Sequence, residues 1–584
     1  EFLKLDKLFK IFLYGAMALS LFFLILINLP AVWVVIGVVS LMILIYGLSE
    51  RYTSVVSVKA KFSSLSVAGI IISILFLIGG TSIQDYISNS LGIGNIESRP
   101  SWQSTIMVAK EGIQKNPIFG AGPNRFSSEW FLNKPIDVNA TPFWDADFSF
   151  GVGFVPTSAI TVGVLGFVAW LLFLLGIAYE GFKIVIGGKT DNFWRFLTLS
   201  SFSATLYLWI LLVVYPPNIV IISLTFIFTG ILLSSGMATD TIKEQVLDFS
   251  KNAKVSFLSV LSLVVLSVVV LSGGYIEAEN VISHVNLERG LKLANIKGDI
   301  DGADRAIARA ALLSKRDLYF RALGEVGILQ MNRLIKRTDL SEDVLRSEFQ
   351  NILTATIENS KKALDYDKTN YQNWLAMGRV YEAIVPLGIS GAYEESLKMY
   401  NEALLRNPNN PSLYLFMARL EVGKGDNEKA KEYISKSLSI KNNYTEAIFL
   451  LSQIQVSEGR LREAIASVES ASIISPNDPT VFFQLGLLRY NNKDYRGATS
   501  ALERAVILNP IYSNAKYFLG LSYNKVDKDE EAIAQFEDLK YLNPDNEEVK
   551  LILSNLRAER SPFSDAVPPV DEKPEGRTKP PIDE

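Results

Sequence analysis

The sequence predicts an all-α protein, built as a polytopic bundle of transmembrane helices that is followed by an extracytoplasmic superhelix of helical repeats. Long apolar stretches fill the first half of the chain, and a chain that crosses lipid forms either helices or a closed barrel. After about residue 275 the apolar residues recur with the period of amphipathic helices. Within this second half, small residues return every 34 residues, which indicates a helical repeat.

The composition separates the chain into a membrane-like half and a charged, helix-rich half. Its 584 residues suffice for several domains, and 49% of them are hydrophobic, a high share for a soluble protein. The sequence begins at Glu1, directly before an apolar stretch, so we expect further spans ahead of it. The predicted parts are a transmembrane domain over 1–275, degenerate helical repeats over 276–370, regular repeats over 371–560 and a Pro-rich, disordered tail over 561–584.

Rare residue types exclude several kinds of site. The chain has no cysteine, which rules out disulfides, thiolate metal ligands and a cysteine nucleophile. Its single histidine, His284, leaves little scope for a zinc site or a histidine base. A net charge of −4 gives no electrostatic reason to expect nucleic acid as a partner. We therefore expect no metal and no cofactor.

Seven apolar stretches are long enough to be transmembrane helices, and the charges between them set an orientation. Lysines and arginines flank the first stretch and fill every second connection, whereas the short connections at 28–31 and 215–218 are uncharged. Because cytoplasmic loops carry the excess of Lys and Arg, residues 83–150 and everything after about 275 are expected outside, in a multi-pass plasma-membrane protein. The stretches cover about 11–28, 31–48, 62–80, 157–178, 196–215, 218–235 and 255–273.

The external connection of residues 83–150 is the part of the membrane half where chemistry is possible. Its charges, prolines and glycines are unsuited to lipid, so it must lie in water or against headgroups. Arg99 and Arg125 suit an anion such as a diphosphate, and Asp145 and Asp147 are possible general bases. Its tryptophans can stack on sugar faces. Each group also has a structural alternative, as a solvated charge or as an aromatic anchor at the membrane interface.

The 34-residue spacing appears in several series of residues. They are Ala418, Ser452, Gly486 and Gly520; Ala430, Ala464, Ala498 and Ala532; and Pro476, Pro510 and Pro544. The pattern resembles tetratricopeptide repeats, in which small residues let two paired helices approach closely. The resemblance implies a tetratricopeptide-repeat superhelix whose concave groove binds a protein or peptide. The aromatic residues of the repeats are expected in the core rather than in contact with a ligand.

A second resemblance concerns the external connection. Arg99 with Trp102, the run Pro117–Phe126 and the later Gly163-Val-Leu-Gly166 resemble the large external loop of the O-antigen ligase and Wzy-type polymerase family. The resemblance covers about residues 95–178. It implies a metal-independent membrane glycosyltransferase, which moves a glycan from a polyprenyl-diphosphate carrier to a glycan, lipid or protein acceptor on the outer face of the membrane.

The same resemblance assigns roles to single residues. Arg99 matches the loop arginine expected to bind the carrier diphosphate, and we place Arg125 and Trp102 with it as candidate substrate-binding residues. The candidate loop-shaping residues are Gly120, Gly122 and Phe126.

One departure from the family leaves the activity open. The family usually has a histidine shortly before the Gly-x-x-Gly span, proposed to activate the acceptor, and this chain has Phe148–Phe154 there with no histidine. Asp147 or Asp145 is the substitute base in an active enzyme. The alternative is a catalytically inactive, membrane-anchored scaffold that binds a protein partner through its repeats. A transporter ranks third, because no charged residue lies inside the seven apolar cores.

Overall fold

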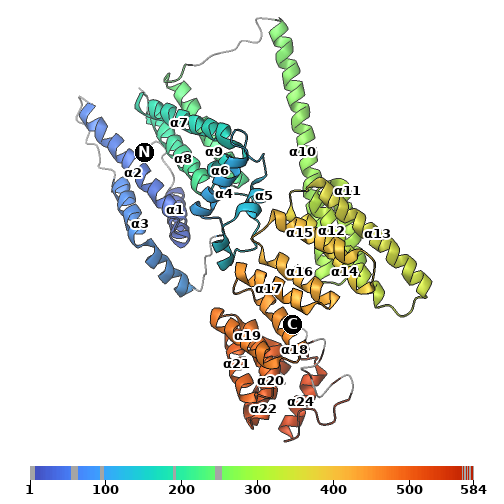
Figure 1. Ribbon diagram of the computed structural model, residues 1–584. Coiled ribbons are helices and arrows are strands. Elements are labelled where there is room, and N and C mark those ends of the chain that lie inside the picture. The colour runs from blue at the N-terminus through green and yellow to red at the C-terminus, as the bar shows by residue number, and fades with distance from the viewer. Residues whose placement is uncertain are drawn as a thin grey trace. The chain divides into compact units, whose positions relative to one another are not determined.

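The computed structural model describes residues 7–53, 64–91, 98–187, 192–216, 218–243 and 253–567, and residues 570, 574, 577 and 580–582. Over these residues every regular element is a helix (Figure 1), so the predicted all-α class is confirmed. The chain forms two compact units. The apolar unit holds Glu1–Pro135 and Ala146–Gly274, and the repeat unit holds Ile136–Asp145 and Tyr275–Glu584. Parts of the predicted span 62–80, external connection and tail lie outside the described residues, namely 62–63, 92–97, 568–569, 571–573, 575–576, 578–579 and 583–584.

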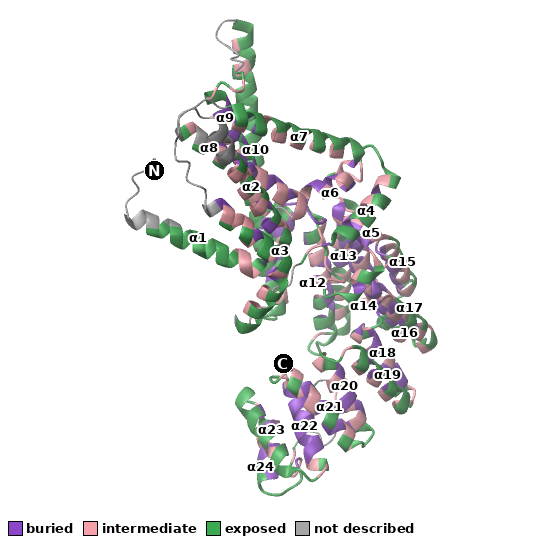
Figure 2. Cartoon of the chain, turned by 90° about the vertical axis from the view of Figure 1, so that its left-hand side faces the viewer, coloured by how far each residue is buried: buried purple, intermediate pink, exposed green. Residues whose placement is uncertain are grey.

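The apolar unit contains long hydrophobic helices. They are α1 Lys7–Ile27, α2 Pro30–Thr53, α3 Ser64–Leu91, α7 Gly163–Gly187, α8 Asn192–Val214, α9 Ile219–Ala238 and the first part of α10 Ala253–Asn295. Five helical stretches among the described residues are long and apolar enough to cross a membrane, and the apolar parts of α1 and α2 are shorter. Their side chains are largely exposed, as on α1 and α10 in Figure 2. Such a surface needs lipid or a partner to cover it, which is compatible with a membrane protein.

Small and polar residues hold these helices together. A Cβ added at Gly37 of α2 would lie 2.6 Å from the Ser73 hydroxyl of α3, so the two backbones approach closely. Trp33 is fully buried, and its ring stacks on Phe76 of α3 at 4.3 Å between centroids. These contacts are the small-residue packing typical of helix pairs in membranes.

The fourth predicted span is wrong at its start. The stretch 157–178 was expected as one helix, but the short helix α6 Phe154–Thr161 ends before α7 begins at Gly163. Val162 between them has φ −120° and ψ 6°, which interrupts the helix. The physical reason lies in the backbone contacts described in the next subsection.

The repeat unit is a succession of helix pairs. After α10 its helices are α11 Ile300–Leu313, α12 Asp317–Ile335, α13 Glu342–Tyr366, α14 Tyr371–Ile384, η3 Val385–Leu387, α15 Ala392–Arg406, α16 Pro411–Lys424, α17 Asn427–Ile440, α18 Thr445–Ser457, α19 Leu461–Ile474, α20 Pro479–Asn491, α21 Tyr495–Leu508, α22 Ser513–Lys525, α23 Asp529–Leu542 and α24 Glu547–Arg557. From α11 to α24 each helix packs against the next one along the chain, and the colours of Figure 1 follow this order.

The 34-residue series marks where the two helices of a pair touch. A Cβ at Gly486 would lie 2.5 Å from Leu502 on the next helix, and a Cβ at Gly520 would lie 2.6 Å from Phe536. In these two pairs the small residue therefore makes room for the large one. Asn410, Asp478 and other turn residues cap the first helix of a pair by accepting a backbone N–H two or three residues on.

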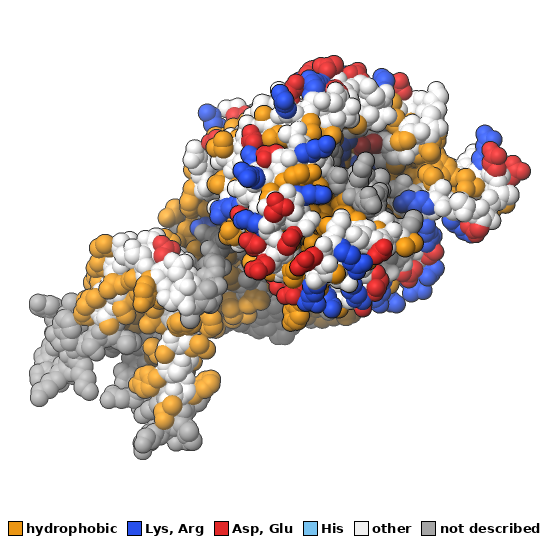
Figure 3. Space-filling view, turned by 90° about the horizontal axis from the view of Figure 1, so that it is seen from below, with side chains coloured by type: hydrophobic (Ala, Val, Ile, Leu, Met, Phe, Trp, Pro, Cys, Tyr) orange, Lys and Arg blue, Asp and Glu red, His pale blue; other side chains and the backbone are white. Residues whose placement is uncertain are grey.

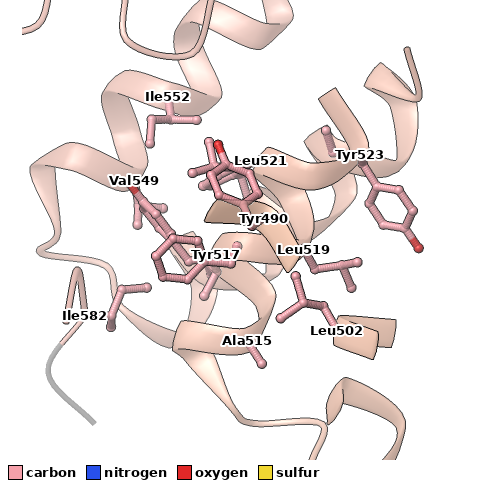
Figure 4. Close-up of a cluster of buried hydrophobic side chains, with 14 of the residues drawn as sticks. Tyr490, Leu502, Ala515, Tyr517, Leu519, Leu521, Tyr523, Val549, Ile552 and Ile582 are labelled. Carbon is pink, nitrogen blue, oxygen red and sulfur yellow. The ribbon is translucent and has the colours of Figure 1, made fainter. Parts of the chain in front are cut away.

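The last repeats form a cluster of buried side chains (Figure 4). Tyr517 of α22 and Val549 of α24 are fully buried there, and Ile582 of the C-terminal segment is only 1% exposed beside them. The Asn514 side chain also bonds the Ile582 backbone, accepting at 3.2 Å and donating at 2.8 Å. One apolar side chain and two hydrogen bonds thus hold residues 580–582 against the last repeats.

The surface has two characters (Figure 3). In one region Lys, Arg, Asp and Glu side chains are mixed, and in another hydrophobic side chains predominate. The mixed charges agree with the many ion pairs of neighbouring or facing helices in the repeat unit, such as Arg557 with Glu537 at 2.6 Å.

Candidate functional site

Two segments of the apolar unit meet backbone to backbone at a pair of glycines. Gly120 and Gly163 both have φ +67°, and a Cβ added to either would lie 2.5 Å from the backbone nitrogen of the other. Only glycine fits two positions with a positive φ and such close backbone contact. We call this contact the glycine junction, made by Pro117–Gly122 and Ile160–Leu165.

The glycine junction explains why the helix breaks before α7. The Ala121 and Gly122 amides donate to the carbonyls of Ile160 and Thr161, at 2.9 Å in each case. In return the Val164 amide donates to the Pro117 carbonyl at 2.9 Å. These carbonyl and amide groups would otherwise bond within one continuous helix, so residues 117–122 stand in for the missing turn.

Residues 98–135 and 146–161 of the apolar unit fold as a small helical subdomain. It contains α4 Trp102–Lys115, which Ser101 caps, α5 Phe126–Asn133, and α6. Phe126 and Trp130 of α5 are 1% exposed, and the Trp130 ring meets Phe148 edge-on at 5.2 Å. The Thr105 hydroxyl accepts from the Val152 amide at 2.9 Å, which ties α4 to the stretch before α6. This subdomain is therefore packed, and Phe126 is part of its core.

Arg99 lies at the carboxyl end of an apolar helix. It is half-buried, its guanidinium donates to the Val214 carbonyl of α8, and its Cζ lies 5.6 Å from the centroid of the Tyr215 ring. A cation is favourable here because the helix dipole ends in uncompensated carbonyls. Trp102 begins α4 three residues later and is 45% exposed. Arg99 and Trp102 thus lie on one short stretch of the apolar unit.

The other candidate residues are spread more widely. Arg125 is half-buried at the start of α5, and Gly122 just before it has φ +105°. Asp145 and Asp147 are both exposed, but Asp147 belongs to the apolar unit and Asp145 to the repeat unit. Of the two carboxylates, only Asp147 therefore shares a unit with Arg99. No cluster of three or more His, Cys, Asp or Glu suited to a metal occurs among the described residues.

The sequence interpretation missed a charged cavity in the repeat unit. A cavity of about 350 Å³ is lined by Arg379, Glu382, Phe416 and Arg419, from α14 and α16. The Cζ atoms of the two arginines lie 5.9 and 5.7 Å from the centroid of the Phe416 ring. Burial raises the pKa of the Glu382 carboxyl, which accepts a hydrogen bond from the Tyr400 hydroxyl.

A signal for this cavity was present in the repeat pattern. Arg379 follows Gly378 and Arg419 follows Ala418, so both arginines stand directly after the small residue of their repeat. Successive repeats bring equivalent positions to the same face of the array. An arginine at one such position in two neighbouring repeats therefore predicts a pair of cations on one face.

Comparisons with known proteins identify the repeats. Models of the tetratricopeptide repeat match residues 411–444 and 483–547. No curated protein matches the chain.

Several solved structures of tetratricopeptide-repeat proteins resemble part of the chain. YrrB, described as having an unusual peptide-binding site, is 20% identical, with 32% of this chain and 94% of that one covered at a TM-score of 0.24. A protein from Thermus thermophilus is 21% identical over 32% of this chain and 99% of its own, at a TM-score of 0.24. One from Parabacteroides merdae is 16% identical over 47% and 98%, at 0.29. The matched segments of this chain are tetratricopeptide repeats.

Proposed function

We propose that this protein is a membrane glycosyltransferase that transfers a glycan from a polyprenyl-diphosphate carrier to an acceptor hydroxyl on the outer face of the membrane. The observation that carries the proposal is the place of Arg99, held at the carboxyl end of the apolar helix α8 beside Tyr215 and close in sequence to the exposed Trp102. If α8 crosses a membrane, its end lies at headgroup depth, where a lipid-linked diphosphate would be found.

The proposed chemistry uses two groups of the apolar unit. The acceptor oxygen attacks the anomeric carbon, the bond from that carbon to the diphosphate oxygen breaks, and the diphosphate leaves with the bonding electrons. Arg99 stabilises the charge that develops on the leaving group, because a guanidinium forms charge-assisted bonds to phosphate oxygens. The Asp147 carboxylate accepts the acceptor's proton. Asp145, two residues earlier in the chain, is the alternative base.

Replacing Arg99 tests the proposal. We expect Arg99→Ala to lower transfer about 30- to 150-fold, since a lost bond to a charged group costs about 2–3 kcal/mol. Transfer is measured in membranes with a lipid-linked glycan donor and a glycan acceptor. Arg337→Ala, which removes an exposed arginine of the repeat unit, is the control and should transfer at the wild-type rate. An Arg99→Ala protein that keeps full activity would contradict the proposed diphosphate contact.

The repeats indicate protein–protein interaction, and the partner is expected to bring the acceptor or an enzyme of the same process to the membrane. This supports a second candidate function, an inactive membrane-anchored scaffold. It is favoured by the absence of a histidine between Phe148 and Phe154. A scaffold predicts no transfer by the wild-type chain, while a partner is still captured through the repeats.

Sidedness is a separate expectation of both candidates. The chain has no cysteine, so single cysteines can be introduced and labelled selectively. We expect Gln114→Cys on α4 and Asn477→Cys in the repeats, both at exposed positions, to react with an impermeant maleimide on intact cells. Lys183→Cys, near the end of α7, should react only after lysis. Labelling of Asn477→Cys that requires lysis would contradict an external repeat domain.

A further inference from the structure

A short piece of the loop belongs to the repeat unit. Ile136–Asp145 groups with the repeats, although the chain on both sides of it belongs to the apolar unit. The segment begins with a turn of 3-10 helix, η1 Ile136–Ala140, which presents Asn139. Asn139 is polar yet only 1% exposed, so its groups need partners: its amide nitrogen and backbone carbonyl have them among the described residues, and its side-chain oxygen has none.

Two successive turns of the repeats bind this segment. The Asn139 side-chain amide donates to the Asn409 carbonyl in the turn before α16, at 2.9 Å. The Lys441 ammonium, in the turn before α18, donates to the Asn139 carbonyl, also at 2.9 Å. One asparagine is therefore held from both sides, with its backbone and side chain bound by different repeats.

An aromatic contact completes the binding. The Trp144 ring centroid lies 5.2 Å from that of Tyr444, in the same turn as Lys441, and the Lys441 ammonium lies 5.6 Å from the centroid of the Trp144 ring. Trp144 also packs on a buried cluster that includes Leu415 and Ala447. Apolar burial, an aromatic pair and a cation over a ring each favour the bound state.

The bound turn departs from the repeat pattern. In the register of the repeats, position 441 is equivalent to Asn407, Ser475, Asn509 and Asn543, and position 442 is equivalent to four prolines. Lys441 and Asn442 are the exceptions. The equivalent residues of the other four turns are shorter, so repeat packing does not require a lysine here.

Burying the Lys441 ammonium group costs free energy unless the group has hydrogen-bond acceptors. Lys441 is only 9% exposed, and burial lowers the pKa of its ammonium group. A buried charge needs compensating hydrogen bonds, and here the Asn139 carbonyl and the Asn443 side chain accept them. Lys441, which departs from the repeat pattern, is thus the residue that binds the segment Ile136–Asp145.

We propose that Asn409, Lys441 and Tyr444 form a specific binding site, the turn site, for the segment Ile136–Asp145, which acts as a ligand built into the same chain. Bound in the turn site, the segment and the turns before α16 and α18 must lie on the same side of any membrane that the chain spans. This inference stands on contacts within the repeat unit and is independent of glycan transfer.

Hydrogen exchange on the full chain in detergent micelles tests the turn site. In the wild type we expect the amides of residues 136–145 and 441–444 to be protected. Trp144→Ala should raise exchange in both segments at least about tenfold, because it removes a packed aromatic side chain. Lys441→Asn, which restores the residue type of the other turns, should release residues 136–145 while α17 and α18 keep their protection.

Matched controls separate release of the segment from general destabilisation. Phe119→Ala removes an aromatic side chain of the same loop that is 73% exposed, and Lys436→Ala removes an exposed lysine of α17. Both should leave exchange in residues 136–145 at the wild-type rate. The proposal is overturned if residues 136–145 exchange like an unfolded peptide in the wild type, or if Trp144→Ala leaves residues 441–444 unchanged.

Discussion

Replacing Gly163 with alanine should disrupt the glycine junction and lower the free energy of unfolding of the apolar unit by about 3 kcal/mol or more. The positive φ of this residue alone costs a non-glycine residue about 1–2 kcal/mol. The added Cβ would also lie 2.5 Å from the Gly120 nitrogen and the Ile118 carbonyl oxygen. These are backbone atoms, which cannot rotate away as a side chain can, so the bonds between 117–122 and 160–165 must break. Unfolding by denaturant in micelles measures the change.

Two other glycines separate the cost of the positive φ from the cost of the close backbone contact. Gly176→Ala in the middle of α7 meets no atom within 4 Å and should be neutral or stabilising by up to about 1 kcal/mol. Gly388→Ala has φ +70° but open space around it, so it should show the backbone cost alone, about 1–2 kcal/mol. If Gly163→Ala costs the apolar unit no more free energy of unfolding than Gly388→Ala costs the repeat unit, the close backbone contact adds nothing.

The repeats could be predicted from sequence because their determinants are local. The glycines of the 34-residue series face a large residue of the next helix, as Gly486 faces Leu502, only 16 residues later. Every pair repeats the same short-range packing, so the pattern returns at a fixed period. The apolar spans were predictable for a similar reason, since length and hydropathy are properties of a continuous stretch.

The break before α7 could not be predicted in this way. Residues 157–178 are apolar without interruption by charge, and Val162 at the break is an ordinary apolar residue. The break depends on hydrogen bonds from residues about 40 positions earlier, such as that from the Ala121 amide to the Ile160 carbonyl. Gly120 and Gly163 stood out as separate motif glycines, but nothing in their spacing indicated that they touch.

The candidate site was predictable only as a set of residue types. The stretch 83–150 stood out by its charges and aromatic residues, and Arg99 and Trp102 do lie on one short stretch. The two carboxylates are only two residues apart, yet they belong to different units. That division follows from contacts of the loop with Lys441, whose bond partner Asn139 is 302 residues away in sequence. Contacts at such separations leave no periodic signal.

Phe536→Ala should destabilise the last repeats by about 3–5 kcal/mol, the usual cost of truncating a buried phenylalanine. Its side chain is fully buried, fills the space left by Gly520 and meets the Tyr517 ring at 5.7 Å between centroids. Because Gly520 has no side chain to fill the gap, the truncation leaves a cavity between α22 and α23. Hydrogen exchange of the full chain should show the loss of protection.

The effect should also be local, because each repeat contacts only its neighbours in sequence. Amide protection in α22–α24 should fall, while α14–α16 keep the wild-type rates, since they share no buried cluster with Phe536. Tyr541→Ala is the matched control on the same helix, 87% exposed, and should change stability by less than about 0.5 kcal/mol. Loss of protection spread evenly from α11 to α24 would instead mean that the repeats unfold as one cooperative block. In that case unfolding of the last repeats would also release residues 136–145 from the turn site. With local unfolding, α22–α24 lose protection while Lys441 stays bound to Asn139.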